Sequence, residues 1–213
     1  MTTFKAGLAA LTALALAGCG TPDGQFETTG IRVTRSACPA VGIPAATGDV
    51  TLFDPPASRD ASAIDVVATI TNLRSTCDET GDYVIGNVTF DVQASRRNAA
   101  GPREVVLPYF SVVVQAGSNV VAKRLGQVAL RFEDGQARAT AQGSATGQVL
   151  RSAATLPQDV RRQITRERKP GDTDAAIDPL SDPAVRAAVQ RASFELLVGF
   201  QLTQEQLAYN ATR

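Results

Sequence analysis

The chain has 213 residues, of which 44% are hydrophobic and 20% charged, a composition that suits a globular domain and argues against a disordered chain or a polytopic membrane protein. Lys plus Arg and Asp plus Glu number 21 each, so the overall basic field that attracts nucleic acid is missing and nucleic acid is not expected as a partner. The sequence contains no His, which removes the commonest general base and metal ligand near neutral pH.

The first 19 residues follow the plan of a secretory signal peptide. Lys5 provides the positive charge, an apolar run extends over residues 6–17, and small residues precede a cleavage point. A run of about 12 apolar residues is too short for a membrane-spanning helix, which needs roughly 20. Residues 1–18 are therefore expected to be a signal peptide that is removed.

The end of this segment, Leu16-Ala17-Gly18-Cys19, resembles the lipobox of bacterial lipoproteins. The resemblance implies that the Cys19 thiol is alkylated by diacylglycerol, that the signal is cut before it, and that the freed amine is acylated, for example with palmitate. Gly20 in place of Asp implies sorting to the outer membrane. The alternative is an ordinary secreted protein that is cut after Ala17 or Gly18.

Residues 19–30 are mostly polar or small, and they are expected to form a flexible tether after the lipidated cysteine. With Cys19 consumed by lipid, Cys38 and Cys77 remain as a pair in an oxidising compartment, where a disulfide is the default. Closing this loop would stabilise the fold by about 4 kcal/mol in the chain-entropy model. The alternative is two free, buried thiols.

Residues 31–213 are predicted to form a single domain. From Ile31 to about Val149 apolar and polar residues alternate, as in the segments 64–70, 83–94 and 103–115, and turn sequences separate them. This pattern predicts a mainly β fold, an antiparallel β-sandwich that is similar to immunoglobulin-like folds in architecture, a similarity that implies no function. Pro108 predicts an edge strand or a bulge.

A stretch of small residues follows at 137–149. Small side chains share one face of the expected strand: Ala137, Ala139, Ala141, Gly143, Ala145 and Gly147. Such a face allows another layer to approach closely. It is read either as a contact surface for a partner or as a bent strand packed against bulky residues of the protein's own sheets or helices.

The last quarter predicts helices. A helix is expected from Thr155, as its cap, to about residue 169, and a second one begins at Ser181 or Asp182. Residues 194–202 fit both a strand and a helical face, and Gly199 favours the strand. Thr203 and Gln206 form a capping-box pattern that predicts a terminal helix.

Catalytic motifs are few. Without His, neither a Ser-His-Asp nor a Cys-His site exists, and neither Lys123 nor Lys169 has the spacing of a Ser-Lys site. A pair of carboxylates, as in glycosidases, is the remaining hydrolytic chemistry, and no spacing singles out such a pair. No catalytic residue and no cofactor is predicted.

Asp172, Asp174 and Asp178 lie close together and form a weak candidate calcium site, because the glycine and the distal Glu of an EF-hand loop are missing. The alternative is a solvated loop or helix caps. A run of basic residues precedes these aspartates: Arg161, Arg162, Arg166, Arg168 and Lys169. It is a candidate contact with anionic lipid headgroups. The simpler alternative is a solvent-exposed helix face.

The sequence therefore predicts a noncatalytic lipoprotein of the outer membrane, a periplasm-facing structural or binding module of the cell envelope. Its expected partners are the membrane, through the lipid anchor, and an envelope protein that the sequence does not identify. The alternative is a lipoprotein that binds carbohydrate or another small ligand, or a carboxylate-based hydrolase. A concave pocket with two converging acids would favour this alternative.

Overall fold

The computed structural model describes residues 36–166, 168 and 171–212. The predicted signal peptide, Cys19 and the predicted tether lie outside the described residues. Two units are distinguished among the described residues, a large one with residues 36–166 and 177–212 and a short one with residues 168 and 171–176.

The large unit contains eight strands, four α-helices and two 3₁₀ turns. In chain order they are β1 (Ala40–Gly42), β2 (Asp49–Phe53), η1 (Ala61–Ala63), β3 (Ile64–Asp78), β4 (Tyr83–Arg96), β5 (Arg103–Gln115), β6 (Asn119–Phe132), β7 (Arg138–Leu150), α1 (Arg151–Ala154), α2 (Gln158–Thr165), η2 (Pro179–Ser181), α3 (Pro183–Arg191), β8 (Phe194–Phe200) and α4 (Gln204–Thr212).

The strands form two four-stranded sheets with the orders β1-β8-β5-β6 and β2-β3-β4-β7. All pairs are antiparallel except β1 with β8, where the first and the last strand run in the same direction. The two sheets share one apolar core, to which both contribute fully buried Phe, Leu and Val side chains. The predicted β-sandwich with helices near the C-terminus is confirmed.

Burial follows the alternation of the sequence. Along β4, every second residue from Val84 to Ala94 is buried, Gly86 included, and the residues between them are exposed or half-buried. The same parity continues to Arg96, which is only 4% exposed. Its guanidinium donates hydrogen bonds to the carbonyls of Gln136, Ala99 and Glu133. Arg96 therefore joins the β4–β5 and β6–β7 turns at one end of the sandwich.

The small-residue face of β7 turns inward. A Cβ atom on Gly143 would lie 2.2 Å from Cζ of Phe90 on the neighbouring strand β4, and one on Gly147 would lie 2.7 Å from Cγ2 of Val113 on the opposite sheet. Ala139, Ala141 and Ala145 pack against the main core. Of the two readings of this stretch, the one confirmed is a strand packed against the protein's own bulky residues.

Pro108 lies in β5, an inner strand between β8 and β6, and its register with β6 is regular, so the expectation of an edge strand or a bulge is wrong. The physical reason is that pairing with β8 begins only at Tyr109. At Pro108 the adjacent chain has already left β8, and Gln201 donates its N–H to the Pro108 carbonyl at 2.9 Å. The missing N–H of proline is therefore tolerated beside the end of a strand instead of at the edge of a sheet.

The helical quarter differs from the prediction in its first part. Thr155 does not begin a helix but follows α1 as its C-cap, and α2 ends at Thr165 with Pro157 as its N-cap. The other caps are confirmed: Asp182 accepts from the Ala184 N–H, and Thr203 and Gln206 form the reciprocal capping box of α4. Residues 194–200 form a strand, as favoured, and this strand, β8, lies between β1 and β5 in its sheet.

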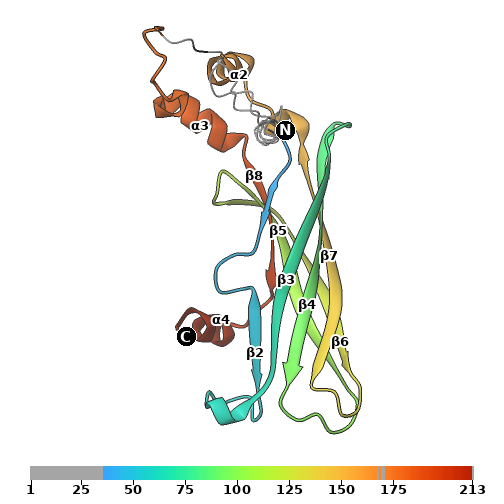
Figure 1. Cartoon of the computed structure of the whole chain (residues 1–213). Helices are drawn as coiled ribbons and strands as arrows, with labels where there is room; N and C mark the ends of the chain where they lie inside the picture. The colour runs from blue at the N-terminus through green and yellow to red at the C-terminus, as the bar shows by residue number, and fades with distance from the viewer. Residues whose placement is uncertain (1–35, 167, 169–170, 213) are drawn as a thin grey trace, which may run out of the picture. The chain divides into compact units, whose positions relative to one another are not determined.

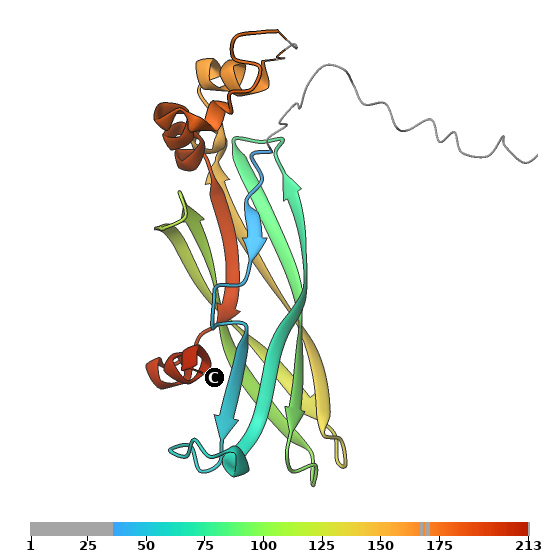
Figure 2. The ribbon, with the colours of Figure 1, turned by 60° about the vertical axis from the view of Figure 1, so that its left-hand side comes forward.

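The helices lie at two places along the strands (Figures 1 and 2). Helices α1 to α3 lie near the β3–β4 turn, and α2 and α3 share a small core of their own around Leu156 and Val185. Helix α4 lies beside β2, where Asn210 donates to the carbonyls of Ala46 and Asp49 at 3.0 and 2.7 Å. The two ends of the sandwich thus carry different structures.

The close approach on β7 makes Gly143 sensitive to any side chain. We expect Gly143→Ala to lower the free energy of unfolding by about 1–3 kcal/mol, the usual cost of overpacking a core, because the new methyl group overlaps the Phe90 ring. Urea denaturation measures the change. Thr140→Ala, on the exposed face of the same strand, serves as the control and should change stability by less than about 0.5 kcal/mol. Equal stability of Gly143→Ala and the wild type would contradict the packing described.

Candidate functional site

Cys38 and Cys77 form a disulfide, with their Cα atoms 6.0 Å apart. The predicted pairing is confirmed. Glu79 lies beside it, with Oε1 accepting a hydrogen bond from Ser36 Oγ at 2.5 Å. Cys38, Cys77 and Glu79 are the only cluster of metal-ligand type within the described residues, and the disulfide removes both thiolates that such a site would need.

The other residues singled out by the sequence have ordinary surroundings. Arg161, Arg162 and Arg166 are exposed on or just after α2. In the short unit, Arg168 Nε lies 3.8 Å from Asp174 Oδ2, and the Asp172 carbonyl accepts from the Ala175 N–H. Asp178 caps η2 by accepting from the Leu180 N–H. Lys169 lies outside the described residues, and the lipid contact and calcium binding stay predictions.

A groove of about 400 Å³ opens between the loop after β2 and helix α4. No pattern in the sequence predicts this groove. Its lining combines two Arg–carboxylate pairs with two aromatic rings and the first turn of a helix: Thr51, Leu52, Phe53, Pro56, Arg59, Asp65, Arg103, Thr203, Glu205, Gln206 and Tyr209. Convergent charged groups beside aromatic walls are typical of small-ligand sites.

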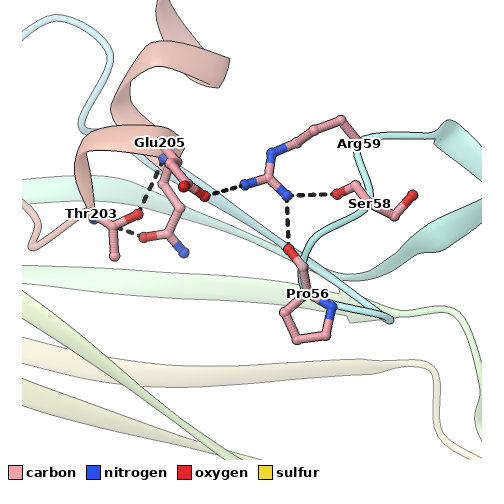
Figure 3. A network of polar contacts seen from close by, with 6 residues as sticks. Pro56, Ser58, Arg59, Thr203 and Glu205 are labelled. Carbon is pink, nitrogen blue, oxygen red and sulfur yellow. Dashed lines mark hydrogen bonds and ion pairs between the residues drawn. The ribbon is translucent and has the colours of Figure 1, made fainter.

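Arg59 crosses the groove from the loop to the helix (Figure 3). Its Nη1 donates to the carbonyls of Pro56 and Ser58 at 2.8 and 2.6 Å, and its Nη2 donates to Glu205 Oε2 at 2.8 Å. The guanidinium also lies over the Phe53 ring, 5.1 Å from the centroid. Phe53 in turn meets Tyr209 of α4 edge to face, with ring centroids 5.2 Å apart.

The second ion pair joins the starts of β3 and β5. Arg103 donates from Nη1 and Nη2 to the two oxygens of Asp65 at 2.8 and 2.7 Å. Only 16% of the Asp65 side chain is exposed. The hydrogen bonds from Arg103 lower the pKa of Asp65 below its ordinary value of 3.8, with smaller contributions from the charges of Arg103 and Arg96. Asp65 therefore carries a fixed negative charge at neutral pH.

Comparison with protein-family models, curated proteins and solved structures gave no significant match.

Within the part of the chain that the structure describes, no helix is both long and apolar enough to cross a membrane.

A carboxylate-based hydrolase needs two acids in one concavity, and the groove has them. Its general acid also needs a raised pKa, and Asp65 does not meet that condition. Two acids, Asp65 and Glu205, line the same concavity. A general acid at neutral pH needs a raised pKa, whereas the pKa of Asp65 is lowered by its pairing with Arg103. The pair is therefore better suited to holding the shape and charge of a binding groove than to proton transfer by Asp65.

The Asp65–Arg103 pair predicts a pH-dependent stability. Because folding lowers the pKa of Asp65, the pair stabilises the fold above pH 3.8 and this contribution is lost as the pH falls through the lowered pKa. At pH 7 we expect Asp65→Asn to reduce the free energy of unfolding by about 1 kcal/mol, the upper range for a partly exposed pair with bidentate geometry.

Urea unfolding of Asp65→Asn and the wild type between pH 7 and pH 2.5 measures this effect. The difference between the two proteins should shrink below pH 3.8. Glu104→Gln breaks the exposed Arg131–Glu104 pair and is the control, with an expected change below about 0.5 kcal/mol. A difference that is constant over the whole pH range would show that Asp65 acts through something other than its charge.

Proposed function

We propose that the chain is a noncatalytic, lipid-anchored protein of the bacterial outer membrane whose sandwich faces the periplasm as a structural or binding module. The observation that carries this proposal is the Cys38–Cys77 disulfide, since such bonds persist in oxidising compartments outside the cytosol. The bond also leaves Cys19 as the odd cysteine, at the end of the lipobox-like sequence. Both observations agree with export followed by acylation.

The contacts of Ser36 and Cys38 support an orientation. Ser36 donates a hydrogen bond to Glu79 in the β3–β4 turn. Two residues later, Cys38 forms the disulfide with Cys77, near the end of β3. A tether from Cys19 would therefore join the sandwich at this end. Tyr83 and Leu150, which pair across β4 and β7, are 46% and 51% exposed at the same end. An aromatic and an aliphatic side chain left in solvent at this end suit contact with a bilayer surface.

The charge at this end is mixed. Arg161, Arg162 and Arg166 are exposed on or after α2, and in our proposal they contact anionic headgroups. The β3–β4 turn is acidic, with Asp78, Glu79 and Asp82 all exposed. The tether and the apolar pair thus support the orientation more strongly than the net charge does.

The groove lies toward the other end of the sandwich. Asp65 lines it, whereas Cys77 lies twelve residues further along the same strand β3. At about 3.3 Å per residue the two are separated by roughly 40 Å. An anchor at the disulfide end would therefore hold the groove well clear of the lipid headgroups, as a binding module requires.

A second candidate function is the binding of a carbohydrate or another small ligand in the groove. The observation that favours it is the convergence of Arg59, Arg103 and the Phe53–Tyr209 pair on one concavity of about 400 Å³. Hydrolysis by a carboxylate pair has less support because the pKa of Asp65 is lowered. This candidate function is compatible with the lipid anchor, because the anchored protein would bind the ligand in its groove.

Replacement of the lipidated residue tests the anchor. We expect Cys19→Ala to abolish metabolic labelling of the protein with palmitate and to block cleavage before residue 19, because only a thiol accepts the diacylglycerol. Membrane fractionation and mass analysis of the N-terminus measure the outcome. The double variant Cys38→Ala/Cys77→Ala removes the disulfide and is the control that keeps labelling. Palmitate labelling that persists in Cys19→Ala would refute the anchor.

The residue after the cysteine tests the sorting. In a bacterium that sorts lipoproteins by this position, we expect Gly20→Asp to move the protein from the outer to the inner membrane. Separation of the two membranes on a sucrose gradient measures the distribution. Gly20→Ser, which introduces a neutral side chain, is the control that should remain in the outer membrane. An unchanged distribution of Gly20→Asp would contradict the proposed sorting.

A further inference from the structure

The two carboxylates of the groove are held in different ways. Asp65 is 16% exposed and binds Arg103 through both oxygens. Glu205 is 80% exposed and reaches Arg59 through Oε2. A surface ion pair of the second kind contributes little stability, because both side chains are solvated when they separate. Glu205 is therefore the exchangeable carboxylate of the groove, and Asp65 is the fixed one.

Arg59 does not depend on Glu205 for its position. Two backbone carbonyls, of Pro56 and Ser58, accept hydrogen bonds from its Nη1, and the Phe53 ring supports the guanidinium from one side. These contacts all come from the same β2–β3 segment, whereas Glu205 belongs to α4 (Figure 3). When Glu205 moves away, the guanidinium is still oriented with Nη2 toward the groove. A planar, pre-oriented fork of this type matches a carboxylate.

The helix adds to the attraction for an anion. Thr203, Glu205 and Gln206, which line the groove, form the cap and the first turn of α4. The positive end of the helix dipole thus borders the groove, where it favours negative charge by a modest amount. The acidic side chain that this helix places there, Glu205, already satisfies that preference in the absence of a ligand.

Apolar surface lies next to the charged fork. Phe53 and Tyr209, both half-buried, meet edge to face, and Leu52 and Pro56 also line the groove. A ligand that placed only a carboxylate on Arg59 would leave this surface in water. A carboxylate attached to an aromatic or aliphatic group would cover it and gain the additional free energy of apolar burial.

We propose that the groove is a binding site for carboxylate-bearing small molecules with an adjoining apolar group, in which Arg59 receives the ligand carboxylate and Glu205 is the intramolecular carboxylate that the ligand displaces. The inference deepens the second candidate function and rests on it, and it is independent of the lipid anchor. Binding follows as an exchange of one carboxylate for another on an unchanged guanidinium, while the exposed Glu205 side chain turns into solvent.

The test uses the purified full chain in detergent and two matched probes, N-acetyl-L-phenylalanine, which carries the carboxylate, and its neutral amide. Titration followed by NMR reports both affinity and place. We expect the acid to bind and to shift the resonances of Phe53 and Tyr209. The amide should bind at least about tenfold more weakly, the usual value of a hydrogen-bonded charge.

Three variants separate the roles. Glu205→Gln removes the competing carboxylate and should raise the affinity for the acid about two- to fivefold, the value of an exposed ion pair. Arg59→Gln should reduce it at least about tenfold, and Arg59→Lys, which keeps the charge but loses the fork, should also weaken it. Arg131→Gln, in an exposed Arg–Glu pair away from the groove, is the matched control that leaves binding unchanged.

The outcomes distinguish this inference from the function on which it rests. Circular dichroism first establishes that each variant is folded, and Arg59→Lys replaces Arg59→Gln if the latter unfolds. Equal binding of the acid and the amide, or weaker binding by Glu205→Gln, overturns the carboxylate assignment. Cellobiose serves as a third probe. If it binds in the groove and the acid does not, the carboxylate assignment is overturned, but the groove remains a small-ligand site. Failure of all three probes with wild type and Glu205→Gln overturns both.

Discussion

The sandwich depends on the close approach that the small face of β7 permits. Gly143 leaves room for the Phe90 ring of its own sheet, and Gly147 leaves room for Val113 of the other. At the same place Tyr109 reaches from β5 to donate its hydroxyl to the Ser144 carbonyl of β7 at 2.7 Å. The contacts of Gly147 and Tyr109 set how closely one sheet lies over the other, and the Gly143–Phe90 contact sets the packing within the β2-β3-β4-β7 sheet.

Much of this architecture could be predicted from the sequence because it rests on local rules. Alternation predicts strands wherever one face is buried, and the caps at Asp182 and Thr203 involve partners within three residues. The small face of 137–149 was also visible as a pattern, although what fills it was not. The disulfide was predictable from the count of cysteines and the expected compartment rather than from any knowledge of their distance.

The groove could not be predicted because its residues come from distant parts of the chain. Arg59 and Glu205 are separated by 146 positions, and Asp65 and Arg103 by 38, so nothing in their spacing marks them as partners.

Arg96 did leave a signal in the sequence, since it continues the buried alternation of β4 with a charged residue where an apolar one is expected. Charged residues in a buried register indicate backbone carbonyls to be satisfied, and here these belong to two turns.

The order of the strands has a consequence for how the protein is made. The β2-β3-β4-β7 sheet, with the Cys77 end of the disulfide, is complete in sequence by Leu150, whereas β8 lies between β1 and β5 and is supplied only by residues 194–200. Until those residues have been synthesised, β1 has no partner strand and β5 offers an open flank to other chains. We therefore expect a chain that ends before β8 to aggregate more readily than the whole chain, because its β5 edge is left open.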